Sequence, residues 1–204
     1  MNYLIQQLGI LIVAAGQSKR LGHPKQLLHF EGKSLINRLI DTVKSSGSYP
    51  LTLVLGSAAD EITTQITASP IDIVFNDQWN EGMASSIRVG VQRIMYLSPN
   101  IDGIMIFVCD QPFISTEQIQ SLIKLQQDSG LPMASCYYAN VLGTPAIFHQ
   151  SIFSELLALE GDVGAKKIIK DRISEVAKLH FEEGIIDIDT MDDYIKLTKE
   201  VSIR

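Results

Sequence analysis

The sequence predicts an α/β fold of three layers, in which a mostly parallel sheet lies between two layers of helices. Short runs rich in β-branched residues alternate along the chain with segments whose apolar residues recur every three or four positions. The short runs are apolar almost throughout, which is typical of strands that helices cover on both faces. Strands that alternate with helices favour a parallel sheet, because each crossover helix returns the chain to the same edge.

The expected elements follow one another in a regular order. Strands are expected at residues 8–14, 51–55, 71–75, 103–109, 132–138 and, as a short piece, 146–148. Helices are expected at residues 34–46, 58–67, 83–97 and 115–127. Ser115 with Gln118 forms a capping box at the start of the fourth helix, and Thr190 with Asp193 resembles one at the start of a last helix.

Composition and charge indicate one compact domain over residues 1–204. The chain is 46% hydrophobic, which is enough for one sizeable core. Its net charge of -6 is dispersed, whereas proteins that bind nucleic acid normally carry a basic face. The apolar stretch 8–16 is far shorter than the roughly 20 residues that span a bilayer, and no Lys or Arg precedes it. We therefore expect a cytoplasmic protein that binds neither nucleic acid nor membranes.

The cysteines and histidines show no metal-binding spacing. Cys109 and Cys136, the two cysteines, each lie in an apolar segment and form no C-x-x-C pair. We expect both to be buried free thiols.

Residues 13–27, VAAGQSKRLGHPKQL, have the layout of a phosphate-binding turn. Gly16 follows an apolar strand, and Lys19, Arg20 and Lys25 follow the glycine. Backbone N–H groups in a glycine turn can face anionic oxygens, and Arg and Lys side chains bind phosphate. The alternative is a solvated loop whose cations have no common ligand.

Two common phosphate motifs are absent from this stretch. The dinucleotide fingerprint G-x-G-x-x-G fails, because the next glycine after Gly16 is Gly22. The P-loop also fails, because Leu27 stands where the first glycine should precede residues 32–34. The turn therefore belongs to another kind of phosphate site.

Residues 11–28, LIVAAGQSKRLGHPKQLL, resemble the signature of the molybdenum-cofactor nucleotidyltransferases, specifically the cytidylyltransferase branch of the MobA-like superfamily. The resemblance continues over nearly the whole chain, and in the family's order, at residues 79–91, 109–115, 143–148, 161–169 and 187–194. It implies a single nucleotidyltransferase domain with the Rossmann-like fold of the nucleotide-diphospho-sugar transferases.

The resemblance also implies an activity. Enzymes of this branch are Mg²⁺-dependent transferases that move CMP from CTP to molybdopterin, or to the molybdenum cofactor, and release pyrophosphate. The implied partners are CTP, the molybdopterin-type acceptor, and a molybdoenzyme or its maturation factor. Two alternatives stay open: the same chemistry on a sugar phosphate or another small phosphorylated metabolite, and a carrier of the cofactor without chemistry of its own.

By resemblance, the nucleotide site is built from the first strand's loop and from the segment after residue 79. Lys25, Arg20 and Asp110 would be catalytic, with Lys25 beside the α-phosphate, where it stabilises developing charge. The residues implied in nucleotide binding are Ala14, Ala15, Gly16, Ser18, Arg20, Lys25, Gly82, Ser85 and Ser86. Guanylyl-transferring relatives carry glycine in place of Ala15 and of Ser18, so the narrower loop here favours CTP over GTP.

Asp110 ends the apolar run 103–109, where a carboxylate can simply terminate a strand. The resemblance instead makes it a magnesium ligand, and Mg²⁺ prefers hard oxygen donors. Alternation in a strand places Asp187 and Asp189 on one face, and the resemblance favours Asp189 as the second ligand. The alternative for this pair is two strand-end carboxylates near a helix N-terminus.

The resemblance places acceptor binding in the last third of the chain, at Gly143, Thr144, Pro145, Asp162 and Lys166. Lys166 stands where the family more commonly has Arg. An ammonium lacks the bidentate geometry of a guanidinium. The resemblance therefore predicts the identity of the acceptor less well than it predicts the reaction.

Overall fold

The structure is a computed structural model of the chain and describes residues 3–67 and 70–201. Its main sheet consists of β1 Leu8–Ala14, β4 Leu51–Leu55, β5 Asp72–Phe75, β6 Gly103–Val108, β7 Met133–Tyr138, β8 Val141–His149 and β9 Val176–His180. A small hairpin pairs β2 His29–Phe30 with β3 Lys33–Ser34. The strands predicted at 8–14, 51–55, 71–75, 103–109 and 132–138 are found with the expected bounds or with one residue fewer at one end, whereas the piece expected at 146–148 is part of the longer β8.

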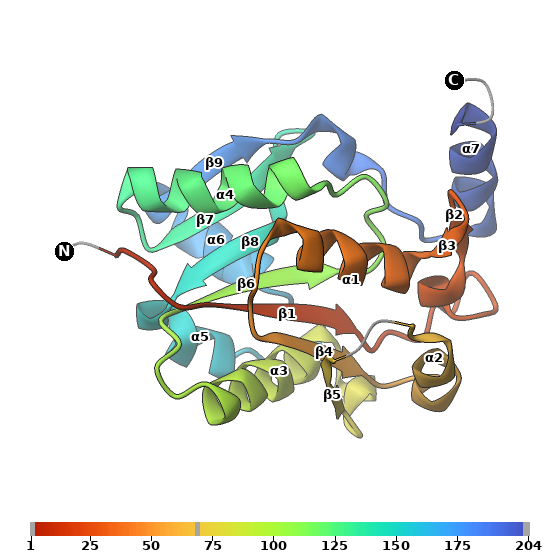
Figure 1. The fold of residues 1–204 in the computed structure, drawn as a ribbon, viewed down its shortest axis with the longest axis horizontal. Coiled ribbons are helices and arrows are strands. Elements are labelled where there is room, and N and C mark those ends of the chain that lie inside the picture. Colours follow the sequence, from red (N-terminus) through yellow and green to blue (C-terminus); the bar gives the residue numbers. More distant parts are fainter. Residues whose placement is uncertain (1–2, 68–69, 202–204) are drawn as a thin grey trace.

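The main sheet is mostly parallel and has the order β5-β4-β1-β6-β8-β7-β9 (Figure 1). The four strands β5, β4, β1 and β6 run in one direction, and β9 runs parallel to β7. Only β8 opposes its neighbours, because it pairs antiparallel with both β6 and β7. The predicted α/β fold is confirmed, with one reversed strand that the sequence did not reveal.

Helices cover both faces of the sheet. They are α1 Leu35–Ser46, α2 Ala59–Gln65, α3 Met83–Leu97, α4 Thr116–Ser129, α5 Phe153–Leu157, α6 Lys166–Asp171 and α7 Met191–Val201. Figure 1 shows α1 and α4 on one face and α3 and α5 on the other. None of the helices within residues 3–67 and 70–201 has both the length and the apolar character needed to cross a bilayer.

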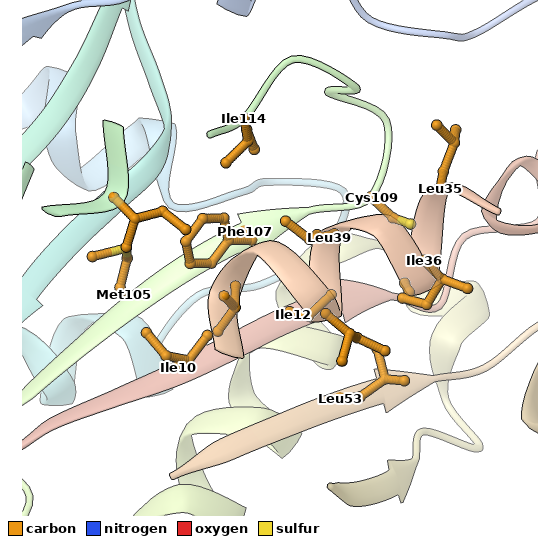
Figure 2. Packing of buried hydrophobic residues seen from close by; sticks show 14 of the residues in the cluster. Ile10, Ile12, Leu35, Ile36, Leu39, Leu53, Met105, Phe107, Cys109 and Ile114 are labelled. Atoms are coloured by element: carbon orange, nitrogen blue, oxygen red, sulfur yellow. The ribbon is translucent and has the colours of Figure 1, made fainter. Parts of the chain in front are cut away.

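The central strand β1 is buried along its whole length and supplies both cores. Ile10 and Ile12 point to the α1 side, where Figure 2 shows them with Phe107 of β6 and Leu39 of α1. Leu11 and Val13 point to the opposite face of the sheet and belong to the second core, which packs under α3. Alternation along the strand therefore explains why β1 reads as a continuous apolar run.

Local features expected from the sequence are also present. Ser115 and Gln118 form the reciprocal capping box, with Gln118 N donating to Ser115 Oγ at 3.3 Å and Ser115 N donating to Gln118 Oε1 at 3.1 Å. Thr190 and Asp193 make the same exchange at the start of α7. Cys109 and Cys136 are buried and free.

Candidate active site

The loop after β1 is folded back on itself by short hydrogen bonds. Ser18 adopts a positive φ of 52°, and its Oγ accepts a hydrogen bond from Lys25 N at 3.0 Å. Leu21 N donates to the carbonyl oxygen of Ser18 at 3.0 Å. The loop thus returns to a short 3-10 turn, η1 Lys25–Leu27, which places Lys25 beside the end of the strand.

Lys25 lies between two carboxylates that come from distant parts of the chain. Its Nζ is 2.8 Å from Asp110 Oδ2 and 3.0 Å from Asp189 Oδ1. Asp110 lies two residues after the end of β6 and Asp189 precedes α7, so the carboxyl end of the central sheet and the C-terminal segment meet here. Burial acts to lower the pKa of Lys25, but the charges and hydrogen bonds of Asp110 and Asp189 outweigh it and raise that pKa.

Arg20 lies at the rim of this cluster. Its Nη1 is 3.7 Å from Asp189 Oδ2, and its side chain is 72% exposed. An exposed ion pair at this distance contributes little to stability. Arg20 is therefore free to contact an anionic ligand without a large structural penalty.

The carboxylates of Asp110 and Asp189 fit a divalent cation. Both already converge on one positive charge, the Lys25 ammonium, and both present hard oxygen donors. Mg²⁺ typically takes one or two carboxylates together with phosphate oxygens and water. Within residues 3–67 and 70–201, no group of three or more His, Cys, Asp and Glu side chains is arranged to hold a metal by itself. The pair therefore suits a cation whose remaining ligands come with a substrate.

A first pocket of about 530 Å³ opens beside this cluster. The loop after β1 forms one wall, and the segment 79–83, which leads into α3, forms the other. Most of the residues predicted to bind the nucleotide line it, namely Ala14, Ala15, Gly16, Ser18, Lys25, Gly82 and Ser86. Arg20 and Ser85 lie outside this lining.

Ser85 braces the pocket from inside the protein. Asn76 Nδ2 donates to Ser85 Oγ at 2.8 Å and to Ser86 Oγ at 2.9 Å, and all three side chains are buried. Ser85 Oγ also donates to the backbone carbonyls of residues 78 and 82. Asn76 was not predicted from the sequence, because a polar residue after a strand does not reveal the hydrogen bonds that it makes after folding.

Gly82 is required by a close approach of two loops. It has a φ of 113°, and a Cβ at this position would lie 2.5 Å from Asp162 Cα. The first turn of α3 donates to the same loop, with Ala84 N 3.2 Å from Gly161 O and Met83 N 3.4 Å from Asp162 Oδ1. The segment expected to bind the acceptor is thereby fixed against the segment expected to bind the nucleotide.

A second pocket, of about 540 Å³, lies on the other side of Asp110. Of the residues predicted to bind the acceptor, Thr144, Asp162 and Lys166 line it. Gly143 stands behind its wall, where a Cβ would collide with the Tyr138 hydroxyl, and Pro145 follows Thr144 in β8. Much of the remaining wall is apolar, formed by Val13, Met83, Ile87, Ile106, Val108, Val141 and Ile185.

Asp187 also lines the second pocket rather than the first. Burial, together with the charges of Asp110 and Asp189, raises the pKa of Asp187. The motif DIDT does not form the strand on which the expected alternation depended. Its two carboxylates face different surroundings, since Asp189 contacts Lys25 whereas Asp187 borders the second pocket.

The two pockets meet at Asp110. Both are lined by Asp110 and Asp162, and also by Val13, Met83 and Val108. A ligand in either pocket would border the same carboxylate, with the Lys25 ammonium on the side of the first pocket. Such an arrangement can hold two reactants end to end, with a positive charge where they touch, which is the requirement of a transfer between anionic molecules.

Comparison with known families agrees with this geometry. The model of the MobA-like NTP transferase domain matches residues 10–177. The chain belongs to this family. The nucleotidyltransferase resemblance of the sequence is thus confirmed at the level of the MobA-like superfamily.

Two relatives align with almost the full chain. A protein named nicotine blue oxidoreductase, from Paenarthrobacter nicotinovorans, is 26% identical over 196 residues, which cover 92% of this chain and 94% of that protein. The purine catabolism protein PucB of Bacillus subtilis (strain 168) is 24% identical over 204 residues, covering 94% and 96%.

Solved structures show the same fold. Rv0371c of Mycobacterium tuberculosis H37Rv superposes with a TM-score of 0.84 at 30% identity, covering 96% of this chain and 98% of that one. A second structure of Rv0371c, in complex with manganese, has a TM-score of 0.79 at 28% identity and covers 95% and 99%. A solved structure that is 28% identical to this chain and shares its fold therefore contains manganese.

Proposed function

We propose that this protein is a Mg²⁺-dependent cytidylyltransferase that transfers CMP from CTP to a molybdopterin-type acceptor and releases pyrophosphate. The observation that supports this most is the Lys25 ammonium, held within 3.0 Å of Asp110 and Asp189 at the point where the two pockets meet. A non-catalytic carrier of the cofactor would have no use for a cation and two carboxylates between two ligands.

The transfer exchanges one phosphoanhydride bond for another. A phosphate oxygen of the acceptor attacks the α-phosphorus of CTP, and the bond to the bridging oxygen breaks, so that pyrophosphate leaves with the electron pair. Lys25 faces the α-phosphate and stabilises its developing charge, and Arg20 reaches the outer phosphates from the rim. Asp110 and Asp189 would hold Mg²⁺, which when bound neutralises phosphate charge.

Two side chains of the loop after β1 favour a pyrimidine over a purine in the first pocket. Ala15 and Ser18 carry side chains where guanylyl-transferring relatives have glycines, and both residues line the pocket. The added methyl and hydroxymethyl groups narrow the loop, which a pyrimidine tolerates better than a purine.

The charged side chains that line the second pocket bear on which acceptor binds there. Its lining includes the carboxylates of Asp110, Asp162 and Asp187, against Lys166 as the cation. Such a pocket suits an acceptor with a single phosphate more than one with several. The names of the two relatives mention nicotine blue and purine catabolism and not molybdopterin. A different small phosphorylated metabolite is therefore the second candidate acceptor.

The test is to incubate the protein with Mg²⁺, one nucleoside triphosphate at a time, and either molybdopterin, a set of sugar phosphates or no acceptor. Mass spectrometry of the product and measured pyrophosphate report the reaction. We expect a CMP–molybdopterin product and pyrophosphate with CTP. A nucleotide-linked product formed only with another acceptor would show that molybdopterin is not the acceptor. Absence of pyrophosphate with every acceptor would refute nucleotidyl transfer. Reduced nicotinamide cofactors without triphosphate form the control for the redox chemistry that one relative's name suggests.

A further inference from the structure

Gln26 lies beneath the loop that forms the nucleotide pocket. It is 1% exposed, and it borders the first pocket from below. Its Nε2 donates a hydrogen bond of 2.7 Å to Ala14 O and a longer one of 3.4 Å to Gly16 O. One buried amide thus ties the last residue of β1 to the loop two residues further on.

Gln26 shares its short 3-10 turn with Lys25, so the turn acts on the loop in two ways. Lys25 N donates to Ser18 Oγ, and Lys25 Nζ contacts Asp110 and Asp189. The residue that carries the proposed catalytic charge is therefore directly followed by the residue that holds the loop carbonyls. Any shift of the loop relative to Lys25 would have to break the contacts of Gln26.

The other end of the Gln26 amide is unusual. Within the part of the chain that the structure describes, Gln26 Oε1 is the one buried side-chain nitrogen or oxygen without a hydrogen-bond partner. Reversing the amide would not help, because an oxygen would then face the carbonyl oxygens of Ala14 and Gly16. A buried acceptor without a donor costs free energy. A methionine of similar size would fill the space without this cost, so packing alone does not account for an amide here.

Peptide geometry explains what the amide does to the loop. In a planar trans peptide, the N–H of one residue points opposite to the C=O of the residue before it. Because Ala14 O and Gly16 O point at Gln26, the N–H groups of Ala15 and Gln17 point away from it. Backbone N–H groups that point outward from such a turn are the donors that anionic oxygens require.

We propose that Gln26 is a positioning residue for the nucleotide: it holds two loop carbonyls inward and so directs the loop N–H groups to the triphosphate. The inference rests on the proposed function only in requiring that the first pocket binds a nucleoside triphosphate. It concerns the phosphates and not the base or ribose, since the two carbonyls belong to the end of β1 and to the glycine turn that follows it.

Direct binding can test the role, because Trp79 is the single tryptophan of the sequence and lines the first pocket. Its fluorescence is titrated with CTP and with cytidine, both in the presence of Mg²⁺. For Gln26→Met we expect the Kd of CTP to rise about tenfold while the Kd of cytidine stays unchanged. A merely structural role would shift both ligands together or neither.

Gln126 provides a matched control. It is also 1% exposed, and its Nε2 donates to Tyr3 O at 2.7 Å and Leu131 O at 3.0 Å, but it lines a different pocket at the other end of the sheet. We expect Gln126→Met to lower the melting temperature and to leave the Kd of CTP unchanged. An equal loss of CTP affinity in both methionine variants would overturn the proposal.

A second variant keeps the test decisive if Gln26→Met does not fold. Gln26→Leu also removes the donor but leaves more room beneath the loop, so we expect a loss of CTP affinity at least as large as with methionine. Wild-type CTP affinity in either folded variant sinks the role of Gln26 alone. Failure of the wild-type protein to bind any nucleoside triphosphate would instead sink the proposed function, and this inference with it.

Discussion

Replacing Asp110 by Asn should separate catalysis from stability. The substitution keeps the shape of the side chain and one oxygen that can accept from Lys25, but it removes the negative charge. In the proposed reaction this charge holds Mg²⁺ and positions the ammonium, so its loss acts on the transition state. We expect kcat/KM to fall by at least about 10³, equivalent to roughly 4 kcal/mol.

The stability cost should be much smaller, for reasons visible in the structure. Lys25 keeps its contact with Asp189 at 3.0 Å, and the repulsion that helps raise the pKa of Asp187 is relieved. A charge-assisted hydrogen bond contributes about 1.5–3 kcal/mol, and these compensations leave a net loss of about 1 kcal/mol. For a chain of this size that lowers the melting temperature by roughly 2–4 °C.

The assay combines pyrophosphate release, measured over a range of CTP concentrations at fixed acceptor and Mg²⁺, with thermal unfolding of the same samples. Asp128→Asn is the control, because Asp128 makes an exposed ion pair with Lys124 on α4 and should change neither quantity. Wild-type turnover of Asp110→Asn would remove Asp110 from the site. A fall of the melting temperature by more than about 8 °C would mean that Asp110 mainly stabilises the fold.

Three further outcomes follow from the site. Lys25→Met should lower kcat more than it weakens CTP binding, since its contact strengthens as charge develops at the α-phosphate; steady-state kinetics that show only a raised KM for CTP would contradict this. The protein should use CTP over GTP by at least about tenfold in kcat/KM, measured by competition and product mass, and equal use of both would end the cytidylyl assignment. Burial raises the pKa of Cys136 to about 12 and also raises the pKa of Cys109. At pH 8 roughly one Cys136 in ten thousand is thiolate, so a thiol reagent should label neither cysteine of the folded protein at a measurable rate. The labelling rate should increase when the chain unfolds or when the pH is raised.

The parallel part of the sheet could be predicted because its strands are apolar on both faces. The reversed strand β8 could not. Residues 146–148 were expected as a short strand, but β8 runs over Val141–His149 and pairs between β6 and β7. Its hairpin turn is formed by Ala139 and Asn140, with φ values of 47° and 62°, and lacks the glycine that usually marks such a turn in a sequence.

Strand β9 was missed for a different reason. Val176–His180 pairs only with β7 and forms an edge of the sheet, so part of it is exposed. Lys178 and His180 interrupt the apolar pattern that identified the buried strands. An edge strand of five residues with polar side chains resembles a loop when only the sequence is considered.

In the site, the charged residues could be predicted, whereas their supports could not. Lys25, Asp110 and Asp189 belong to motif blocks, and the structure brings them together. Asn76 and Gln26 act on serine hydroxyls and backbone carbonyls whose positions exist only after folding. Nothing in the spacing of the sequence distinguishes such an amide from an ordinary polar residue after a strand or loop.

Asp189, the second carboxylate beside Lys25, lies outside the segment that the family model matches. That match ends at residue 177, whereas Asp189 follows the fully buried Ile188. Ile188 N donates to Asp110 O at 3.2 Å, so the anchoring of Ile188 itself brings Asp189 to Lys25. The result is a group of carboxylates, including Asp187, around one ammonium, and the excess negative charge repels itself in the half-buried surroundings. Added positive charge would relieve this repulsion, and this is the electrostatic argument for the Mg²⁺ that we propose at Asp110 and Asp189.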